Sequence, residues 1–137
     1  MTVEKQDIKE DFYQGDYKAI EVTIYADKLL TQIKDLTNAE SIDYVLTHRK
    51  DGTIYIQKST FDGDTSIKII DPPTSGKVVV YLQPVDSVSI YGTFRHQMQI
   101  TDVDGKPECV MTGTVNIYRS YARRLTRGAV SVYLVGG

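Results

Sequence analysis

The residues of this chain with the most reactive side chains are two histidines, His48 and His96, and one cysteine, Cys109. A histidine can serve as a general base or a metal ligand, and a cysteine as a nucleophile or a soft ligand. Each histidine lies in the middle of an alternating stretch, on the same face as its apolar residues. This position favours a hydrogen-bonded, half-buried residue. Cys109 is offset along the sequence from both histidines, and no CxxC or HxxxH spacing occurs, so we expect no metal site. A single cysteine also excludes an intrachain disulfide, and we interpret it as a small strand residue.

Two acidic stretches, Asp62-Gly63-Asp64 and Asp102-Val103-Asp104-Gly105, resemble fragments of calcium loops. A calcium loop of the EF-hand type needs a fuller run of oxygen ligands that ends in a glutamate. Neither stretch continues in this way, so both are interpreted as turns. The chain also contains no GxSxG, GxxxxGK[ST] or GxGxxG sequence. We therefore expect no catalytic residue, no cofactor and no metal.

The C-terminal segment, residues 119–137, is the strongest candidate for a functional surface. It begins with a basic connector, contains no acidic residue and ends in an apolar run rich in β-formers. Arginine side chains bind carboxylates and phosphates through forked hydrogen bonds. We predict that this segment docks on a partner through Arg119, Arg123, Arg124, Arg127, Val130, Val132, Tyr133 and Leu134.

Two questions about this segment stay open. The arginines could form a solvated connector, or they could bind nucleic acid together with Tyr118 and Tyr121. We favour a protein partner because the rest of the chain is neutral to acidic and would not steer DNA. The apolar run 129–137 is either the last strand of this domain or a strand added to another subunit.

Composition limits the class of protein. With 137 residues and 41% hydrophobic residues the chain can build one domain with a sizeable core. Its net charge of −2 creates no field that attracts nucleic acid or a membrane surface. It has no apolar run of membrane-spanning length, and its polar N-terminus has no signal-peptide core, so we expect folding in a cytosol. Its ten tyrosines, against no tryptophan, suit half-buried strands and interfaces.

Alternating polarity predicts the structural elements. Apolar and polar residues take turns along several short runs, which is typical of strands with one buried face. Turn signals every 8–12 residues indicate an antiparallel all-β sandwich or small barrel. A segment at 26–34 fits either a helical turn or a loop. The predicted strands are Ala19–Tyr25, Ser41–Arg49, Ile54–Gln57, Ile67–Ile70 and Lys77–Gln83, followed by a hairpin over Phe94–Tyr118.

The chain resembles the immunoglobulin-like domain found at the N-terminus of phage upper baseplate proteins and in related tail, neck and head accessory proteins. Four stretches between residues 12 and 118 carry the resemblance, and each consists of turn residues next to a strand. They are Phe12–Lys18 with its Gln-Gly-Asp turn, Lys34–Ala39 with Asp-Leu-Thr, Ser75–Val78, and Tyr91–Phe94 together with Asp102–Lys106 and Gly113–Ile117.

This resemblance implies an antiparallel Ig-like β-sandwich of about 7–9 short strands with terminal arms. It divides the chain into an N-terminal arm (1–11), the sandwich (12–118) and the C-terminal segment (119–137). It also implies a non-enzymatic virion protein of a tailed phage, made in the bacterial cytoplasm. Its partners would be other virion proteins and further copies in a ring or array, with no membrane and no favoured nucleic acid.

Two other functions are kept as alternatives. Sandwich folds also host sugar-binding sites, so the domain could recognise carbohydrate on a host surface, with tyrosine rings as stacking platforms. The absence of tryptophan argues against this function. An enzyme ranks last, because no motif supports one.

Overall fold

The alternating runs form strands close to where the sequence predicts them. The run from Phe94 to Tyr118 becomes a hairpin of β7 (Gly92–Asp102) and β8 (Pro107–Ile117). Every second side chain of β7 from Phe94 to Ile100 is buried, and those between are exposed. Gly105 occupies the turn with a φ of 80°, which glycine adopts without a steric penalty. The predicted one-sided hairpin is confirmed.

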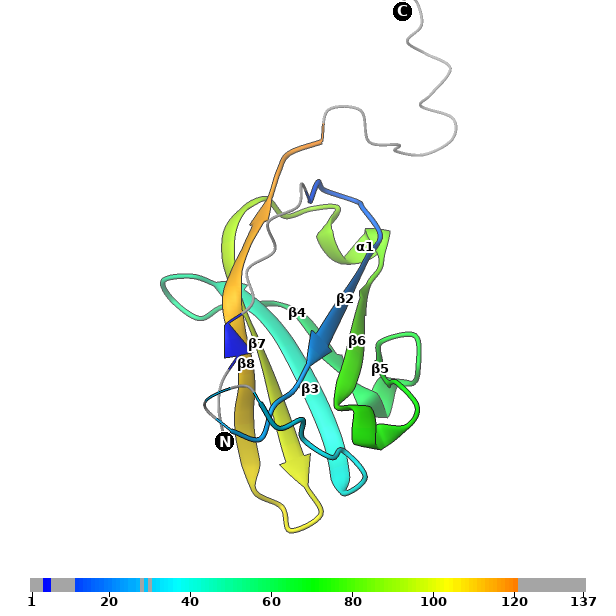
Figure 1. Ribbon diagram of the computed structural model, residues 1–137. Coiled ribbons are helices and arrows are strands. Elements are labelled where there is room, and N and C mark those ends of the chain that lie inside the picture. The colour runs from blue at the N-terminus through cyan, green and yellow to red at the C-terminus, as the bar shows by residue number, and fades with distance from the viewer. Residues whose placement is uncertain (1–3, 6–11, 28, 30, 121–137) are drawn as a thin grey trace, which may run out of the picture.

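The structure is a computed structural model and describes residues 4–5, 12–27, 29 and 31–120. Two sheets face each other in this part of the chain, with very little helix (Figure 1). No helix among these residues is long and apolar enough to cross a membrane. Besides β7 and β8, the elements are β1 (Glu4–Lys5), β2 (Lys18–Thr23), β3 (Ala39–His48), β4 (Ile54–Ser59), η1 (Thr60–Asp62), β5 (Ile67–Ile69), η2 (Pro73–Ser75), β6 (Lys77–Leu82) and α1 (Pro84–Ser87).

The order of the strands defines the fold. One sheet has the order β1-β8-β7-β3-β4 and the other β2-β6-β5. The pairs are antiparallel except β1 with β8, which is parallel. An immunoglobulin sandwich places its first, second, fifth and fourth strands in one sheet and its third, sixth and seventh in the other, and variable-type domains add a strand beside the third. With β4 as that added strand and β1 beside β8, this chain is an Ig-like β-sandwich, as predicted.

The core lies between the inner faces of the two sheets. Ile20 and Val22 of β2 pair with Val80 and Val78 of β6. Full burial of an aliphatic side chain contributes about 1.5–3 kcal/mol, so these rows and their partners supply most of the driving force for folding. The side chains from the opposite sheet that join the same cluster are Ile42, Tyr44, Leu46, Ile56, Phe94, Met98, Ile100, Val110, Met111, Val115 and Ile117.

One polar pair sits inside this core. Tyr44 of β3 and His96 of β7 are both 0% exposed. The Tyr44 hydroxyl and His96 Nδ1 are hydrogen-bonded at 3.0 Å, and the two rings meet edge to face. Burial raises the pKa of Tyr44 well above its usual range, so its hydroxyl keeps its proton. His96 is thus hydrogen-bonded as expected, but fully rather than half buried.

The loop between β2 and β3 packs against Gly76. This loop contains a bridge between Tyr25 and Ile33, which resolves the predicted choice between helical turn and loop in favour of the loop. Gly76 has a φ of 68°, and its carbonyl accepts a hydrogen bond from the Ile24 amide at 2.8 Å. A Cβ added to Gly76 would lie 2.9 Å from the Lys34 carbonyl oxygen and would also collide with Ile33. The motif stretch Ser75–Val78 therefore needs glycine at position 76 for two reasons: the close approach of the loop and the positive φ angle.

We expect Gly76→Ala to destabilise the fold more than Gly105→Ala. Both glycines have a positive φ, but a Cβ at Gly105 meets no atom within 4 Å. Gly105→Ala is the control, and it should lose only about 1–2 kcal/mol of stability, which is the cost of a left-handed backbone for a residue with a Cβ. Gly76→Ala should lose at least about 1 kcal/mol more stability than the control, because its Cβ overpacks the site. Denaturant unfolding of both variants tests this, and equal losses would contradict it.

Removing the buried hydroxyl in Tyr44→Phe should lower the free energy of unfolding by about 1–3 kcal/mol, because His96 Nδ1 loses its partner in a dry core. Tyr55→Phe is the matched control, since Tyr55 is 43% exposed and surface changes usually stay within about 0.5 kcal/mol. Chemical denaturation of both variants provides the comparison. If Tyr44→Phe were no less stable than the control, the pair would have no structural role.

Candidate docking surfaces

Among the predicted docking residues, Arg119 lies in the described part of the chain. The structure therefore bears on the root of the predicted C-terminal arm. The remaining predicted residues fall outside the described range: Arg123, Arg124, Arg127, Val130, Val132, Tyr133 and Leu134.

The root of the arm is attached to the turn before β2. Tyr118 forms an isolated parallel bridge with Tyr13. The Tyr118 amide donates to the Phe12 carbonyl at 2.8 Å, and the Gln14 amide donates to the Tyr118 carbonyl at 2.9 Å. The Ser120 amide donates to Gln14 Oε1 at 3.1 Å. These bonds fix the path of the chain as far as Ser120.

Exposed aromatic rings surround this root. The Tyr13 and Tyr118 rings lie 5.5 Å apart, and the Arg119 guanidinium stacks 4.3 Å from the centre of the Tyr91 ring. The three tyrosines are between 41% and 54% exposed. Tyrosine and arginine are enriched at protein interfaces and in their energetic hot spots. We call Tyr13, Tyr91, Tyr118 and Arg119 the aromatic end patch.

A basic cleft opens beside the β3–β4 hairpin. It has a volume of about 490 Å³. The register of the sheet forms this cleft, because Arg95 of β7 pairs with Thr47 of β3 on one side and with Thr114 of β8 on the other. The residues lining this basic cleft are Arg49, Lys50, Thr93, Phe94, Arg95 and Thr114.

The cations of the basic cleft have no counter-charge from the described residues. Arg49, Lys50 and Arg95 are exposed and form no ion pair with any carboxylate described in the structure. The neighbouring Asp51 is engaged elsewhere, since it accepts from the Thr53 amide at 3.0 Å and lies 3.3 Å from the His48 ring. Three positive charges that converge on hydroxyl-bearing threonines can bind an anionic group.

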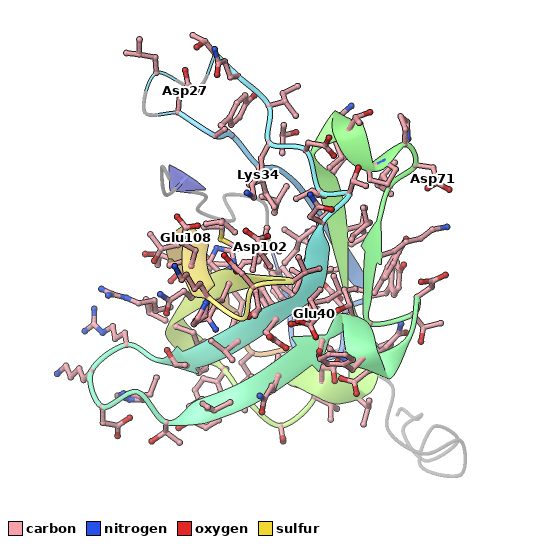
Figure 2. The ribbon with its side chains drawn as sticks, turned by 90° about the horizontal axis from the view of Figure 1, so that it is seen from below. Asp27, Lys34, Glu40, Asp71, Asp102 and Glu108 are labelled. Atoms are coloured by element: carbon pink, nitrogen blue, oxygen red, sulfur yellow. The ribbon has the colours of Figure 1, made fainter. Side chains whose placement is uncertain are left out.

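Carboxylates gather at the opposite end of the strands, which Figure 2 views directly. Glu40 and Glu108 are the second residues of β3 and β8, and Asp102 is the last residue of β7. Lys34 stands among them and forms an ion pair of 4.0 Å with Asp102. We call this surface the acidic end and define it by Asp27, Glu40, Asp71, Asp102 and Glu108, together with Asp104 of the turn between β7 and β8.

Three further carboxylate interactions stabilise turns. In each, a carboxylate accepts hydrogen bonds from a threonine a few residues later, which favours the charged form and lowers the pKa below its ordinary value of 3.8. The threonine side chain has the largest effect on two of them and the threonine amide on the third. The pairs are Asp27 with Thr31, Asp35 with Thr37, and Asp51 with Thr53.

The remaining reactive side chains also take part in local structure. His48 Nδ1 accepts hydrogen bonds from the Lys50 amide at 3.1 Å and the Asp51 amide at 3.4 Å, so it caps the β3–β4 turn. Cys109 is half-buried on β8, where the Gln97 side chain donates to its Sγ at 3.1 Å. In the described ranges, no three His, Cys, Asp or Glu side chains gather in a way that could hold a metal ion.

Sequence reasoning missed the basic cleft. Arg49 and Arg95 lie far apart along the chain, and the register of β3 against β7 brings them together. The available signal was the Arg49-Lys50 pair at the end of a predicted strand, next to a hairpin turn. Without the register, that pair looks like ordinary turn residues.

No protein-family model and no curated protein matches this chain. Among solved structures it is similar to the fibronectin(III)-like modules of CbhA from Clostridium thermocellum, with 10% identity, 87% of this chain and 94% of that chain covered, and a TM-score of 0.45. It is also similar to CopC from Methylosinus trichosporium, with 5% identity, 92% of this chain and 91% of that chain covered, and a TM-score of 0.41. A third similar structure is that of extracellular domains 3–5 of Drosophila OTK, with 14% identity, 87% of this chain and 33% of that chain covered, and a TM-score of 0.32. The strand order of the chain itself defines its class.

The turn carboxylates predict how stability depends on pH. A carboxyl group with a lowered pKa in the fold stabilises the protein fully above its unfolded value of 3.8, and this stabilisation is lost as the pH falls through the folded value. The triple variant Asp27→Asn, Asp35→Asn, Asp51→Asn should therefore be less stable than the parent at neutral pH. The gap should narrow as the pH falls below 3.8 and should vanish below the folded pKa values of the three carboxyl groups. Unfolding free energies across this range provide the measurement, and a gap independent of pH would contradict the assignment.

Proposed function

We propose that this protein is a non-enzymatic structural component of a tailed-phage virion, in the baseplate, tail, neck or head accessory parts, and that it acts through contacts with other virion proteins. The observation that carries the proposal is the agreement between the four phage-like motif stretches and the turns of the Ig-like sandwich. Gly15 has a φ of 81°, and the Tyr13 amide donates to the Asp16 side chain at 2.9 Å. This Gln-Gly-Asp turn leads directly into β2.

The other motif stretches fall at structural turns in the same way. In Asp-Leu-Thr, the Thr37 amide donates to the Asp35 carboxylate at 2.9 Å, just before β3. Gly76 closes η2 before β6, and Gly105 turns the β7–β8 hairpin. The residues that carry the resemblance are thus those on which the turns depend, and this supports reading the resemblance as one of fold and family.

The absence of a catalytic role is part of this proposal. Supporting it, the histidines interact with Tyr44 in the core and with the β3–β4 turn, and the carboxylates with lowered pKa values are solvent-exposed turn caps. In catalytic sites, perturbed groups usually converge on one cleft.

Assembly contacts are assigned to the aromatic end patch and the arm that follows it. The aromatic end patch ends in Arg119, the first residue of the basic connector, so rings and guanidinium groups would form one continuous surface. The proposed partners are neighbouring virion proteins and further copies of the chain, met after synthesis in the host cytoplasm. The proposed arm contacts beyond Arg119 come from Arg123, Arg124, Arg127, Val130, Val132, Tyr133 and Leu134.

Host-surface carbohydrate binding is the second candidate. One observation favours it: exposed tyrosine rings, such as Tyr17 at 55% and Tyr91 at 54%, could stack on sugars. A glycan array with the purified chain distinguishes the two functions. Specific glycan binding that is lost in Tyr17→Ala or Tyr91→Ala would favour this alternative over the assembly role.

Removal of residues 121–137 should leave a folded sandwich that no longer enters virions. The truncation is placed after Ser120 because the Ser120 amide is bonded to Gln14. Purified particles from a host that supplies the truncated chain provide the measurement, with circular dichroism and thermal unfolding as controls for folding. Incorporation at the level of the full chain would contradict the role of the arm.

A further inference from the structure

The two ends of the sandwich carry opposite charge. The basic cleft lies where β3 ends and β7 begins, whereas the acidic end lies where β7 ends and β8 begins. From Phe94 to Asp102 the β7 strand rises by roughly 26 Å at about 3.3 Å per residue. This separation exceeds the Debye length of about 8 Å at physiological salt, so the two surfaces barely neutralise each other within one molecule.

The acidic end also has a shape suited to a cleft. The β7–β8 hairpin projects beyond the other turns at this end of the sandwich (Figure 1). Its tip exposes 71% of the apolar side chain of Val103. The neighbouring Asp104 is exposed, with one carboxylate oxygen accepting from the Lys106 amide at 3.2 Å. The tip therefore presents a negative charge beside an apolar group.

The basic cleft offers matching groups. Its cations would face the Asp104 carboxylate. Phe94 also lines the basic cleft, with the Tyr55 ring packed edge to face against it at 5.4 Å. The Phe94 ring is 5% exposed, so the apolar surface of this pair comes from Tyr55, which is 43% exposed. The two surfaces are therefore complementary in charge.

We propose that the basic cleft of one copy binds the Asp102–Lys106 hairpin of a second copy, so that the chains associate head to tail. The two surfaces of such a contact differ, so repetition produces a ring when the rotation closes and a filament when it does not. This inference deepens the proposed assembly role and rests on it for the biological setting. The contact itself depends on the opposite charges of the two ends.

The test uses charge reversals on the full chain. Arg95→Glu reverses charge in the basic cleft, and Asp104→Lys reverses it at the hairpin tip. Lys68→Glu is the matched control, because Lys68 is an exposed residue on β5 in the other sheet. Analytical ultracentrifugation over a wide protein concentration range, at low and high salt, measures the association constant. Circular dichroism confirms that each variant remains folded.

The parent chain should self-associate at low salt and dissociate at high salt. Arg95→Glu and Asp104→Lys should each lower the association constant at least about tenfold, and Lys68→Glu should not. An equimolar mixture of the two reversed variants should associate again, because each contact then pairs opposite charges. A parent chain that stays monomeric, an Arg95→Glu variant that associates normally, or a mixture without recovery would overturn the proposal. A monomeric parent that binds a DNA oligonucleotide through Arg95 would overturn it as well.

Failure here is distinguishable from failure of the proposed function. A chain that stays monomeric in solution but enters virions removes head-to-tail docking and leaves the virion role intact. A chain that self-associates through Arg95 but is absent from particles retains the docking contact and removes the virion role.

Discussion

The mutual burial of two alternating strand faces is the constraint on which the rest of the structure depends. Each strand of the sandwich directs every second side chain inward, and a shift of register by one residue would reverse both faces. Tyr44 and His96 strengthen this constraint, because their hydrogen bond exists only when β3 and β7 pair in the observed register. The register in turn decides which polar residues meet on the outside.

The surfaces at the two ends follow from this arrangement. Strands that are apolar on one face confine charged residues to the outer face and the turns, and antiparallel pairing collects turns that are distant in sequence at a common end. Arg49 and Arg95 line one cleft at one end in this way, and Glu40 and Glu108 both lie at the other end. The short bonds from residues 12–14 to residues 118–120 then fix the chain at the aromatic end patch. These end surfaces are the ones to which we assign the proposed contacts with neighbours.

Most of the fold could be predicted from the sequence, because period-two polarity is a local signal. The run from Phe94 to Ile100 shows its buried face directly, and Gly105 marks its turn. The register between strands is not local, so the basic cleft and the stacking of Arg119 on Tyr91 were not foreseen. His96 was correctly interpreted as hydrogen-bonded, but its full burial depends on how the two sheets pack. Most of the predicted docking residues lie beyond the described part of the chain, and their role remains a prediction.

Hydrogen–deuterium exchange of the full chain at low and at high protein concentration tests the central claim most directly, namely that the ends of a rigid sandwich make its contacts. The account predicts slower exchange at high concentration around Arg49–Lys50, Thr93–Arg95 and the Asp102–Lys106 hairpin, with β2, β5 and β6 unchanged. Protection that appears instead on the outer face of the β2-β6-β5 sheet, or no change at either end, would contradict it.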